Sequence, residues 1–427
     1  MTALNRFDYP SKLELHRKDR RISGTVTLDG SKSISNRALI LRALSGKDFP
    51  ITGLGTSKDV STMQALLASQ EEVLDAGAAG TTFRFLTAFL AWSGKPCTLT
   101  GSERMKQRPI GPLVAALRTL GARIEYLENE GYPPLRFSGG QWEQVTRTLT
   151  LPASVSSQYL SALLMIAPRL PMGLELNLEG ELVSRPYLEM TLRMMGFFGV
   201  NHTWQGQTIT VEPQAYEDRP FQVEADWSAA SYYYSIAALS EHCNLKLFGL
   251  HRESLQGDAA IAQFMVKLGV HTEFGENHIR LIKNSGPQPS EFEYDFINCP
   301  DLAQTVMACC GGLGVTGKFT GLQTLFIKET DRIAAMQTEL KKIAVRFNEA
   351  PRDSTLLAQE ANFIVEGRAR FWTTPEFATY EDHRMAMAMA PLAMLHNIVI
   401  KDPGVVIKSY PAFWSDLESL GFETLPV

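Results

Sequence analysis

The feature that most constrains this chain is an internal repeat of about 75 residues. An amphipathic helical segment that ends at a Leu-Gly-like stop and continues as a β-type run occurs five times. The stop positions are Gly121, Gly196, Gly269, Ala344 and Gly421, which lie 75, 73, 75 and 77 residues apart. Glycine is common just past a helix end because the left-handed conformation costs it no steric penalty. We expect Ala344 to end its helix differently.

A second segment recurs out of phase with the first, as a small polar turn that runs into a strongly apolar helix. Its six copies cover residues 30–44, 75–92, 154–167, 226–239, 299–310 and 381–395. A helix that is apolar on nearly all sides is buried rather than lying at the surface. Two helices per copy, with short strands between them, predict an α/β fold of six β-α-β-α-β-β units with buried helices.

The first of the six units is shortened. Six full units would need about 450 residues, and the chain has 427. After the helical segment 61–69, only a few residues precede the next apolar copy at residue 75. We therefore expect the first unit to lack most of its strands; the alternative is that this segment forms one long loop.

Composition excludes several functional classes. The formal net charge is −5 and 44% of residues are hydrophobic, which favours neither nucleic acid nor an anionic membrane surface as a partner. The run from Met385 to Leu395 is too short to span a bilayer, which takes about 20 residues. The N-terminal MTALNRFDYP lacks the apolar core of a signal peptide, so we expect a cytoplasmic protein.

The five cysteines do not indicate a metal or redox site. No C-x-x-C pair occurs among Cys97, Cys243, Cys299, Cys309 and Cys310. We expect buried, inert thiols and no metal.

Basic residues gather at the starts of several predicted helices. Lys32 and Ser33 lie at a helix start, where free N–H groups and the helix dipole favour anions, and Arg37 shares a helix face with Ser33. Arg108 precedes a proline that opens another helix. The segment 312–318 resembles a phosphate-binding P-loop, but Phe319 replaces the Ser or Thr and a strand-like run follows, so we reject it.

The same arrangement occurs in the C-terminal half. Lys328, Glu329 and Arg332 surround a helix start, and His383 and Arg384 directly precede a helix too apolar to face water. Lys408 lies between a strand and the last helix. Any one of these motifs alone is typical of a surface, but cations at equivalent places in several repeats predict a positive cleft for carboxylate or phosphate ligands.

Over nearly its whole length the chain resembles the 5-enolpyruvylshikimate-3-phosphate synthase family. The resemblance rests on GSKSISNRAL, RMKQRPIG, SVSSQYLSALL, LVSRPYLEMTL, IKETDRIAAMQTEL and EDHRMAM. It implies a two-domain enolpyruvyl transferase fold with three repeats per domain. We expect one domain to comprise 1–28 and 225–427, with the strand Lys12–Leu28 as its missing edge, and the other to comprise 29–224.

The resemblance also implies an activity, the transfer of the enolpyruvyl group of phosphoenolpyruvate to the 5-hydroxyl of shikimate 3-phosphate with release of phosphate. The implied shikimate 3-phosphate ligands are Lys32, Ser33, Arg37, Ser156, Ser157, Gln158, Ser184, Tyr187, Asp301 and Lys328. The implied phosphoenolpyruvate ligands are Lys32, Gly80, Arg84, Arg108, Gln158, Arg332, Arg384 and Lys408. The implied catalytic residues are Lys32, Asp301, Glu329 and His383.

In this family the domains close around the substrates, and the chemistry needs no metal or organic cofactor. Asp301 would take the hydroxyl proton, and Glu329 with Lys32 would handle the proton at C3 of phosphoenolpyruvate. The resemblance further implies a monomer and, since Gly80 is retained, inhibition by glyphosate.

Three departures from the family pattern leave alternatives open. Ala78 stands where an Asn is usual, Thr324 stands in place of an Asn, and the first unit is shortened. Two alternative hypotheses remain. The enzyme could use a different alcohol acceptor, or it could be a family member that binds anions without catalysis. The sister enzymes that act on UDP-N-acetylglucosamine usually carry a reactive Cys in the basic loop, and here none lies there.

Overall fold

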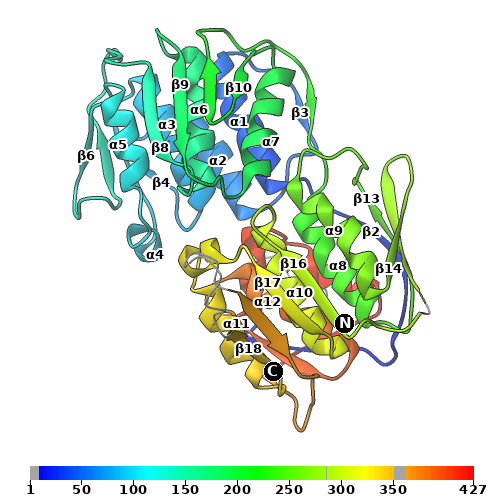
Figure 1. Cartoon of the computed structure of the whole chain (residues 1–427). Coiled ribbons are helices and arrows are strands. Elements are labelled where there is room, and N and C mark those ends of the chain that lie inside the picture. Colours follow the sequence, from blue (N-terminus) through cyan, green and yellow to red (C-terminus); the bar gives the residue numbers. More distant parts are fainter. Residues whose placement is uncertain (1–8, 285, 351–361) are drawn as a thin grey trace. The chain divides into compact units, whose positions relative to one another are not determined.

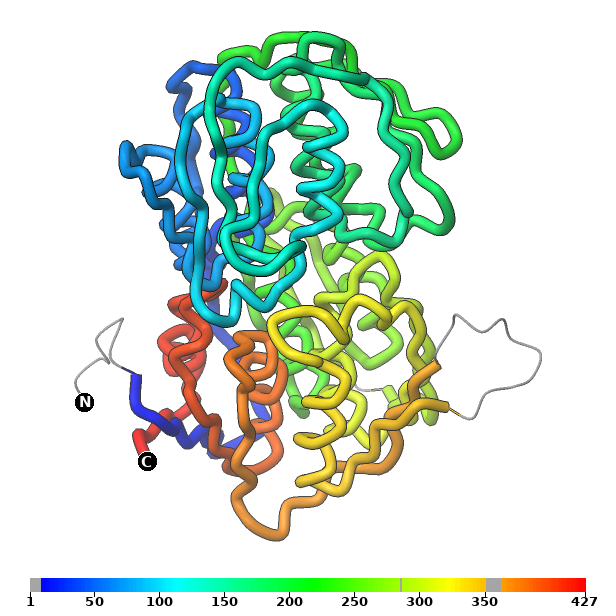
Figure 2. The backbone as a smooth tube through the Cα atoms, turned by 90° about the vertical axis from the view of Figure 1, so that its left-hand side faces the viewer, coloured from blue at the N-terminus to red at the C-terminus, as the bar shows by residue number. Residues whose placement is uncertain are grey.

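The computed structural model describes residues 9–284, 286–350 and 362–427. The N-terminal residues 1–8, within the stretch that lacks a signal-peptide core, lie outside the described residues. The chain divides into two compact units (Figures 1 and 2). Unit 1 comprises residues up to Asp29 and Glu224–Val427, and unit 2 comprises Gly30–Val223. The domain limits expected from the sequence, 28/29 and 224/225, each lie one residue from these.

Unit 2 contains the first three repeats. Repeat 1 has α1 (Lys32–Ser45), β3 (Ile51–Thr52) and α2 (Lys58–Ala68). Repeat 2 has β4 (Val73–Asp75), α3 (Gly80–Ser93), β5 (Cys97–Thr100), α4 (Glu103–Lys106), α5 (Gly111–Thr119), β6 (Ile124–Tyr126) and β7 (Leu135–Phe137). Repeat 3 has β8 (Thr148–Pro152), α6 (Ser157–Ile166), β9 (Leu174–Glu179), α7 (Arg185–Phe197), β10 (Thr203–Gln205) and β11 (Thr208–Val211), and β12 (Phe221–Gln222) follows it.

Unit 1 contains the other three repeats. Repeat 4 has β2 (Arg21–Thr27), α8 (Trp227–Leu239), β13 (His242–Phe248), the turn η2 (Gly257–Ala260), α9 (Ile261–Phe264), β14 (Val270–Phe274) and β15 (His278–Lys283). Repeat 5 has β16 (Glu291–Asp295), α10 (Ala303–Leu313), β17 (Thr316–Thr320), η5 (Gln323–Ile327), α11 (Arg332–Lys341), β18 (Arg346–Glu349) and β19 (Phe363–Glu366). Repeat 6 has β20 (Glu376–Phe377), α12 (His383–Met389), β21 (Ile398–Lys401), η7 (Pro403–Lys408), α13 (Phe413–Ser419), β22 (Glu423–Pro426) and β1 (Lys12–His16).

Each full repeat forms one mixed four-stranded sheet, which confirms the predicted α/β repeat. In repeat 2 the strand order is β4-β5-β7-β6; β4 and β5 run parallel and the other pairs antiparallel. Five described sheets follow this plan. The first repeat has only the two-stranded pair β3 and β12, and four residues connect α2 to β4. The shortened first repeat is thus confirmed, and the long-loop alternative is wrong.

The prediction of one N-terminal strand from Lys12 to Leu28 is wrong. Residues 12–16 form β1, which lies inside the last sheet between β21 and β22, and residues 21–27 form β2, the edge strand parallel to β13. Residues 17–20 form a bend between them, in which Arg17 donates to the carbonyl oxygens of Leu420 and Arg21, and Arg20 donates to that of Leu239. Only β2 supplies the missing edge that the sequence led us to expect.

The apolar helices form the interior of each unit. In unit 1, α8 contacts α10, and α10 contacts α12; in unit 2, α6 contacts α3 and α7. Every residue of α8 except Ser228 is buried. This confirms the predicted burial and brings the polar N-terminal turns of these helices together at the end of each helical layer.

Two of the predicted helix stops differ from the structure. Gly121, Gly269 and Gly421 take positive φ angles, as expected. Gly196 instead lies inside α7, and Gly199 takes the left-handed conformation after it. Ala344 has φ 59°, so it adopts the conformation of the glycines it replaces rather than a different ending. The helix α7 extends past Gly196, so its stop falls at Gly199 instead. At Ala344 the chain accepts backbone strain in place of a glycine.

All five cysteines are buried and free, as predicted. Burial raises the pKa of each thiol, and with it the fraction that stays protonated and unreactive. No described helix is long and apolar enough to cross a membrane.

Candidate active site

In unit 2, the start of α1 carries Lys32 beside a buried carboxylate. Lys32 Nζ lies 3.4 Å from Asp59 Oδ2 on α2. A Cβ at Gly30 would stand 1.9 Å from the carbonyl oxygen of Gly53, so only glycine permits this approach of the two loops. The close approach fixes the turn from which Lys32 projects.

Arg37 lies deeper in unit 2 than the sequence suggests, with 2% of its surface exposed. Its guanidinium donates to Thr191 Oγ1 at 2.7 Å, to Ser161 Oγ at 3.0 Å and to the Ser33 carbonyl at 2.9 Å. Burial lowers the pKa of Arg37 to about 10, which still leaves it charged at neutral pH. The side chain therefore ties α1 to α6 and α7, and its predicted contact with substrate stays a prediction.

Gly80, Arg84 and Arg108 lie together at the start of α3. Arg84 is buried and donates to the carbonyl oxygens of Gly80 at 3.1 Å and Pro109 at 3.3 Å. A Cβ built on Gly80 would lie 2.5 Å from Arg108 Nη1. Arg84 thus holds the helix start and the Arg108 loop, and the absent side chain of Gly80 leaves room for the Arg108 guanidinium.

The start of α6 joins this group. Ser156 caps the helix by accepting from Gln158 N, Ser157 is the first helical residue, and Gln158 Nε2 donates to Thr81 Oγ1 at 3.0 Å. This bond connects the two motifs, because Thr81 directly follows Gly80 in α3.

Ser184 and Tyr187 lie at the start of α7. Ser184 is buried and has φ 58°, a left-handed conformation that a non-glycine residue adopts rarely. Such strain costs on the order of 1–3 kcal/mol and gathers at functional sites. The Tyr187 ring lies 6.0 Å from the Arg37 guanidinium carbon.

In unit 1, one buried guanidinium connects three carboxylates. Arg332, 1% exposed, donates from Nε to Asp382 Oδ2 at 2.7 Å, from Nη1 to Asp301 Oδ1 at 3.2 Å and from Nη2 to Glu329 Oε2 at 3.0 Å. Burial alone would lower the pKa of Arg332, but Asp382, Glu329 and Asp301 raise it above its ordinary value. The charge on Arg332 is permanent.

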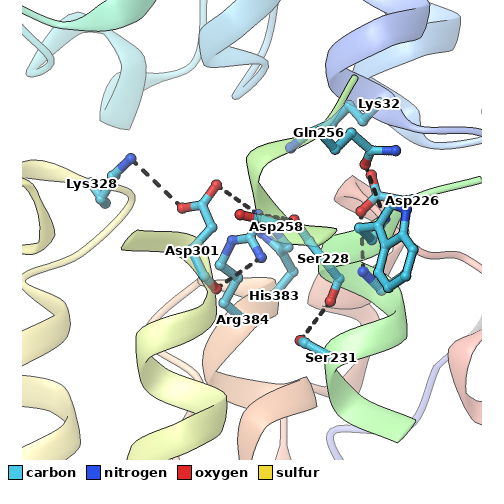
Figure 3. A network of polar contacts seen from close by, with 12 residues as sticks. Lys32, Asp226, Ser228, Ser231, Gln256, Asp258, Asp301, Lys328, His383 and Arg384 are labelled. Carbon is cyan, nitrogen blue, oxygen red and sulfur yellow. Dashed lines mark hydrogen bonds and ion pairs between the residues drawn. The ribbon is translucent and has the colours of Figure 1, made fainter. Parts of the chain in front are cut away.

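Further cations surround the same carboxylates. Lys408 Nζ lies 3.0 Å from Glu329 Oε1. Arg384 Nη2 lies 2.9 Å from Asp301 Oδ2, and Lys328 Nζ lies 3.7 Å from Asp301 Oδ1 (Figure 3). The structure therefore brings together all the predicted cations of unit 1. Burial would raise the pKa of Asp301, yet Arg384, Lys328 and Arg332 hold it well below its usual range.

His383 is buried, 3.7 Å from Asp382 Oδ1 at the start of α12. Asp382 accepts from the backbone N–H of Arg384 at 2.8 Å and so caps the helix. Thr324, one of the departures, lies in η5, and its hydroxyl is buried without a hydrogen-bond partner among the described residues. Ala78 is exposed ahead of α3.

Asp258 and Ser228 also belong to this cluster, although neither was predicted from the sequence. Ser228 Oγ donates to Asp258 Oδ2 and accepts from Arg384 Nη2 at 3.4 Å (Figure 3). Burial, then the nearby negative charge of Asp301, raise the pKa of Asp258 to about 7. The only sequence signal is the acidic residue in the turn Gly257–Ala260, which is equally typical of an ordinary helix start.

Comparison with known proteins places this arrangement in a family. The family model for EPSP synthase (3-phosphoshikimate 1-carboxyvinyltransferase) matches residues 16–69 and 64–417. A 3-phosphoshikimate 1-carboxyvinyltransferase of Bacteroides fragilis (strain YCH46) is 50% identical over 404 residues, covering 94% of this chain and 96% of that protein. The chain belongs to the EPSP synthase family. Its activity is that of a 3-phosphoshikimate 1-carboxyvinyltransferase, a transferase of aromatic amino-acid biosynthesis.

More distant relatives agree with this membership. The enzyme of Vibrio cholerae (strain M66-2) with the same name is 35% identical over 429 residues, covering 93% of this chain and 97% of that protein. A solved structure of EPSP synthase from Acinetobacter baumannii superimposes with a TM-score of 0.76 at 20% identity, covering 97% of this chain and 99% of that chain. This last likeness supports the EPSP synthase fold alone.

The raised pKa of Asp258 predicts a specific pH dependence of stability. An Asp titrates near pH 3.8 when unfolded and near 7 here, so the folded state binds more protons between these values. Its contribution to the free energy of unfolding is therefore lost as pH rises from about 4 to about 7, by at most ~1.4 kcal/mol per pH unit. Asp258→Asn, which carries no charge, should flatten this loss.

The measurement is the melting temperature of both proteins between pH 5 and 8. We expect the melting temperature of Asp258→Asn to rise relative to that of the wild type as the pH increases. A difference that stays constant across this range would contradict the raised pKa.

Proposed function

We propose that this transferase joins phosphoenolpyruvate to the 5-hydroxyl of shikimate 3-phosphate, with the predicted residues of both units as its ligands. The observation that carries the proposal is the cluster around Arg332, in which four cations surround Asp301 and Glu329. Such a cluster of cations suits the phosphate and carboxylate groups of the two substrates, whose mutual repulsion must be offset before they react.

In unit 1 we assign the proton transfers to Asp301 and Glu329. With its low pKa, Asp301 is a weak base while Arg384, Lys328 and Arg332 face it. When substrate anions bind these cations, their pull on Asp301 weakens and its pKa rises toward the range of a useful base. Substrate binding would in this way activate Asp301 to accept the 5-hydroxyl proton.

Glu329 lies between Arg332 and Lys408, with Oε2 3.0 Å from Arg332 Nη2 and Oε1 3.0 Å from Lys408 Nζ. Together with Lys32 it would deliver and remove the proton at C3 of phosphoenolpyruvate. We assign Arg332, Arg384 and Lys408 to phosphoenolpyruvate, and Lys328 with Asp301 to shikimate 3-phosphate. His383, which is buried beside Asp382, would help to hold Asp382 in place.

In unit 2 we assign Lys32, Gly80, Arg108 and Gln158 to phosphoenolpyruvate. Shikimate 3-phosphate would meet Lys32, Ser33, Ser156, Ser157, Gln158, Ser184 and Tyr187. Arg37 and Arg84 are largely committed to protein oxygens. We therefore propose that these two arginines act chiefly by positioning the helix starts, so that binding requires little further ordering.

The remaining proposals follow from the family. We propose that the chain acts in the cytoplasm as a monomer, with small molecules as its only partners, and that the reaction uses no metal or organic cofactor. Mass measurement in solution and an assay in the presence of a chelator test these statements.

Release of phosphate tests the proposed function. The full chain is mixed with phosphoenolpyruvate and shikimate 3-phosphate, and both phosphate and the enolpyruvyl product are quantified. We expect the two to appear in equal amounts, with neither formed when one substrate is omitted. Binding of both ligands without turnover would favour a family member that has lost catalysis. Turnover only with another alcohol would favour a different acceptor.

Gly80→Ala should weaken the binding of phosphoenolpyruvate. The new methyl group would stand 2.5 Å from Arg108 Nη1, so the guanidinium must move. Loss of a charge-assisted contact is worth about 1.5–3 kcal/mol, and we expect the KM for phosphoenolpyruvate to rise roughly tenfold or more, with a smaller change in kcat.

Gly196→Ala is the matched control, since a Cβ there meets no atom within 4 Å. It should leave both constants unchanged. An unchanged KM for phosphoenolpyruvate in Gly80→Ala would contradict the role assigned to Arg108.

A further inference from the structure

The turn that precedes α12 is held in a conformation its residues disfavour. Asp382 N donates to the carbonyl oxygen of Thr379 at 2.8 Å, and the two residues between them have positive φ angles, 53° at Tyr380 and 56° at Glu381. Turns of this kind favour Asn and Gly, because other residues lose about 1–2 kcal/mol each in the left-handed region. Some other contact must hold the turn.

That contact comes from Glu339, which is fully buried on α11. Its Oε1 accepts from Tyr380 Oη at 2.7 Å, and its Oε2 accepts from Ala378 N at 3.0 Å and from Lys342 Nζ at 2.5 Å. Burial and the hydrogen bond to Glu339 raise the pKa of Tyr380 to about 12, so the hydroxyl keeps its proton and remains a donor. The carboxylate thus joins both the strand side and the tip of the turn to α11.

The same helix holds the segment beyond the turn. Arg332 and Glu339 are seven residues apart, two helical turns, and so share a face of α11. Arg332 binds Asp382, and Asp382 caps the helix that carries Arg384. The strained turn is therefore fixed on both sides from one helix, and Arg384 follows directly after it.

We propose that Glu339 is a positioning residue that holds Tyr380 and Glu381 in the left-handed turn and thereby sets the position of the Arg384 guanidinium beside Asp301. The proposal rests on the proposed function, in which Arg384 binds phosphoenolpyruvate. Without Glu339, the two turn residues lower their free energy by leaving the left-handed region. Asp382 and Arg384 then shift with them. Glu339 itself does not touch the reacting groups.

The test combines Glu339→Ala with a change that removes the strain. Glu339→Ala should raise the KM for phosphoenolpyruvate about fivefold to tenfold, with a smaller change in kcat. Glu381→Gly, which occupies the left-handed region without strain, should restore this KM to within about twofold when added to Glu339→Ala. Tyr380→Phe should show part of the effect, and Lys341→Ala, exposed on the same helix, should show none.

Amide hydrogen exchange of Ala378 and Asp382 gives a readout that does not depend on the assignment of Arg384. Both amides should exchange faster in Glu339→Ala. Unchanged exchange would contradict the proposal that Glu339 holds the turn. Faster exchange with an unchanged KM, or a KM that Glu381→Gly does not restore, would overturn the positioning role. Arg384→Ala is run in parallel, since an unaffected KM there would mean that the assignment of Arg384 under the proposed function has failed instead.

Discussion

The polar end of unit 1 is organised by the hydrogen bonds of the Arg332 guanidinium. This guanidinium is buried, and it bonds carboxylates from three separate segments: Asp301 before α10, Glu329 before α11 and Asp382 before α12. A buried charge is stable only when paired and hydrogen-bonded, so each of these segments is constrained by the others. Fixed charges held in a protein interior need little reorganisation during a reaction, which is the main source of electrostatic catalysis.

Unit 2 uses the same principle with different residues. Arg37 and Arg84 are buried; they bind carbonyl oxygens at the starts of α1 and α3, and Arg37 also binds hydroxyls within α6 and α7. Lys32 and Arg108 are more exposed and stand beside them. In each unit, then, a buried arginine connects a helix start to neighbouring segments, and other cations lie nearby. The strained residues Tyr380 and Glu381 are held by Glu339 and lie directly before Asp382, which Arg332 binds.

The repeat was readable from the sequence because glycine stops and apolar helices recur at a fixed spacing. Motifs at the helix starts likewise predicted which cations gather around Asp301. The direction of a side chain could not be predicted from the sequence. The guanidinium of Arg37 could find hydrogen-bond acceptors either on a ligand or on Thr191, and the sequence does not distinguish these. Asp258 and Glu339 were missed for a related reason, because their importance arises from burial and from partners in other segments. Ala344 was misjudged because tertiary packing overrides a local backbone preference.

Arg332→Lys separates the charge of Arg332 from its geometry, because lysine keeps the positive charge but cannot bond three carboxylates in the fixed geometry of a guanidinium. The initial rate of phosphate release is measured for this variant and for Arg280→Lys, a half-exposed control on β15, after circular dichroism has shown both to be folded. If Arg332 holds the three carboxylates in place, Arg332→Lys loses at least about 100-fold in kcat/KM, which corresponds to roughly 3 kcal/mol of transition-state stabilisation, while the control is unchanged. A folded Arg332→Lys variant with kcat/KM near that of the wild type would contradict this role of Arg332.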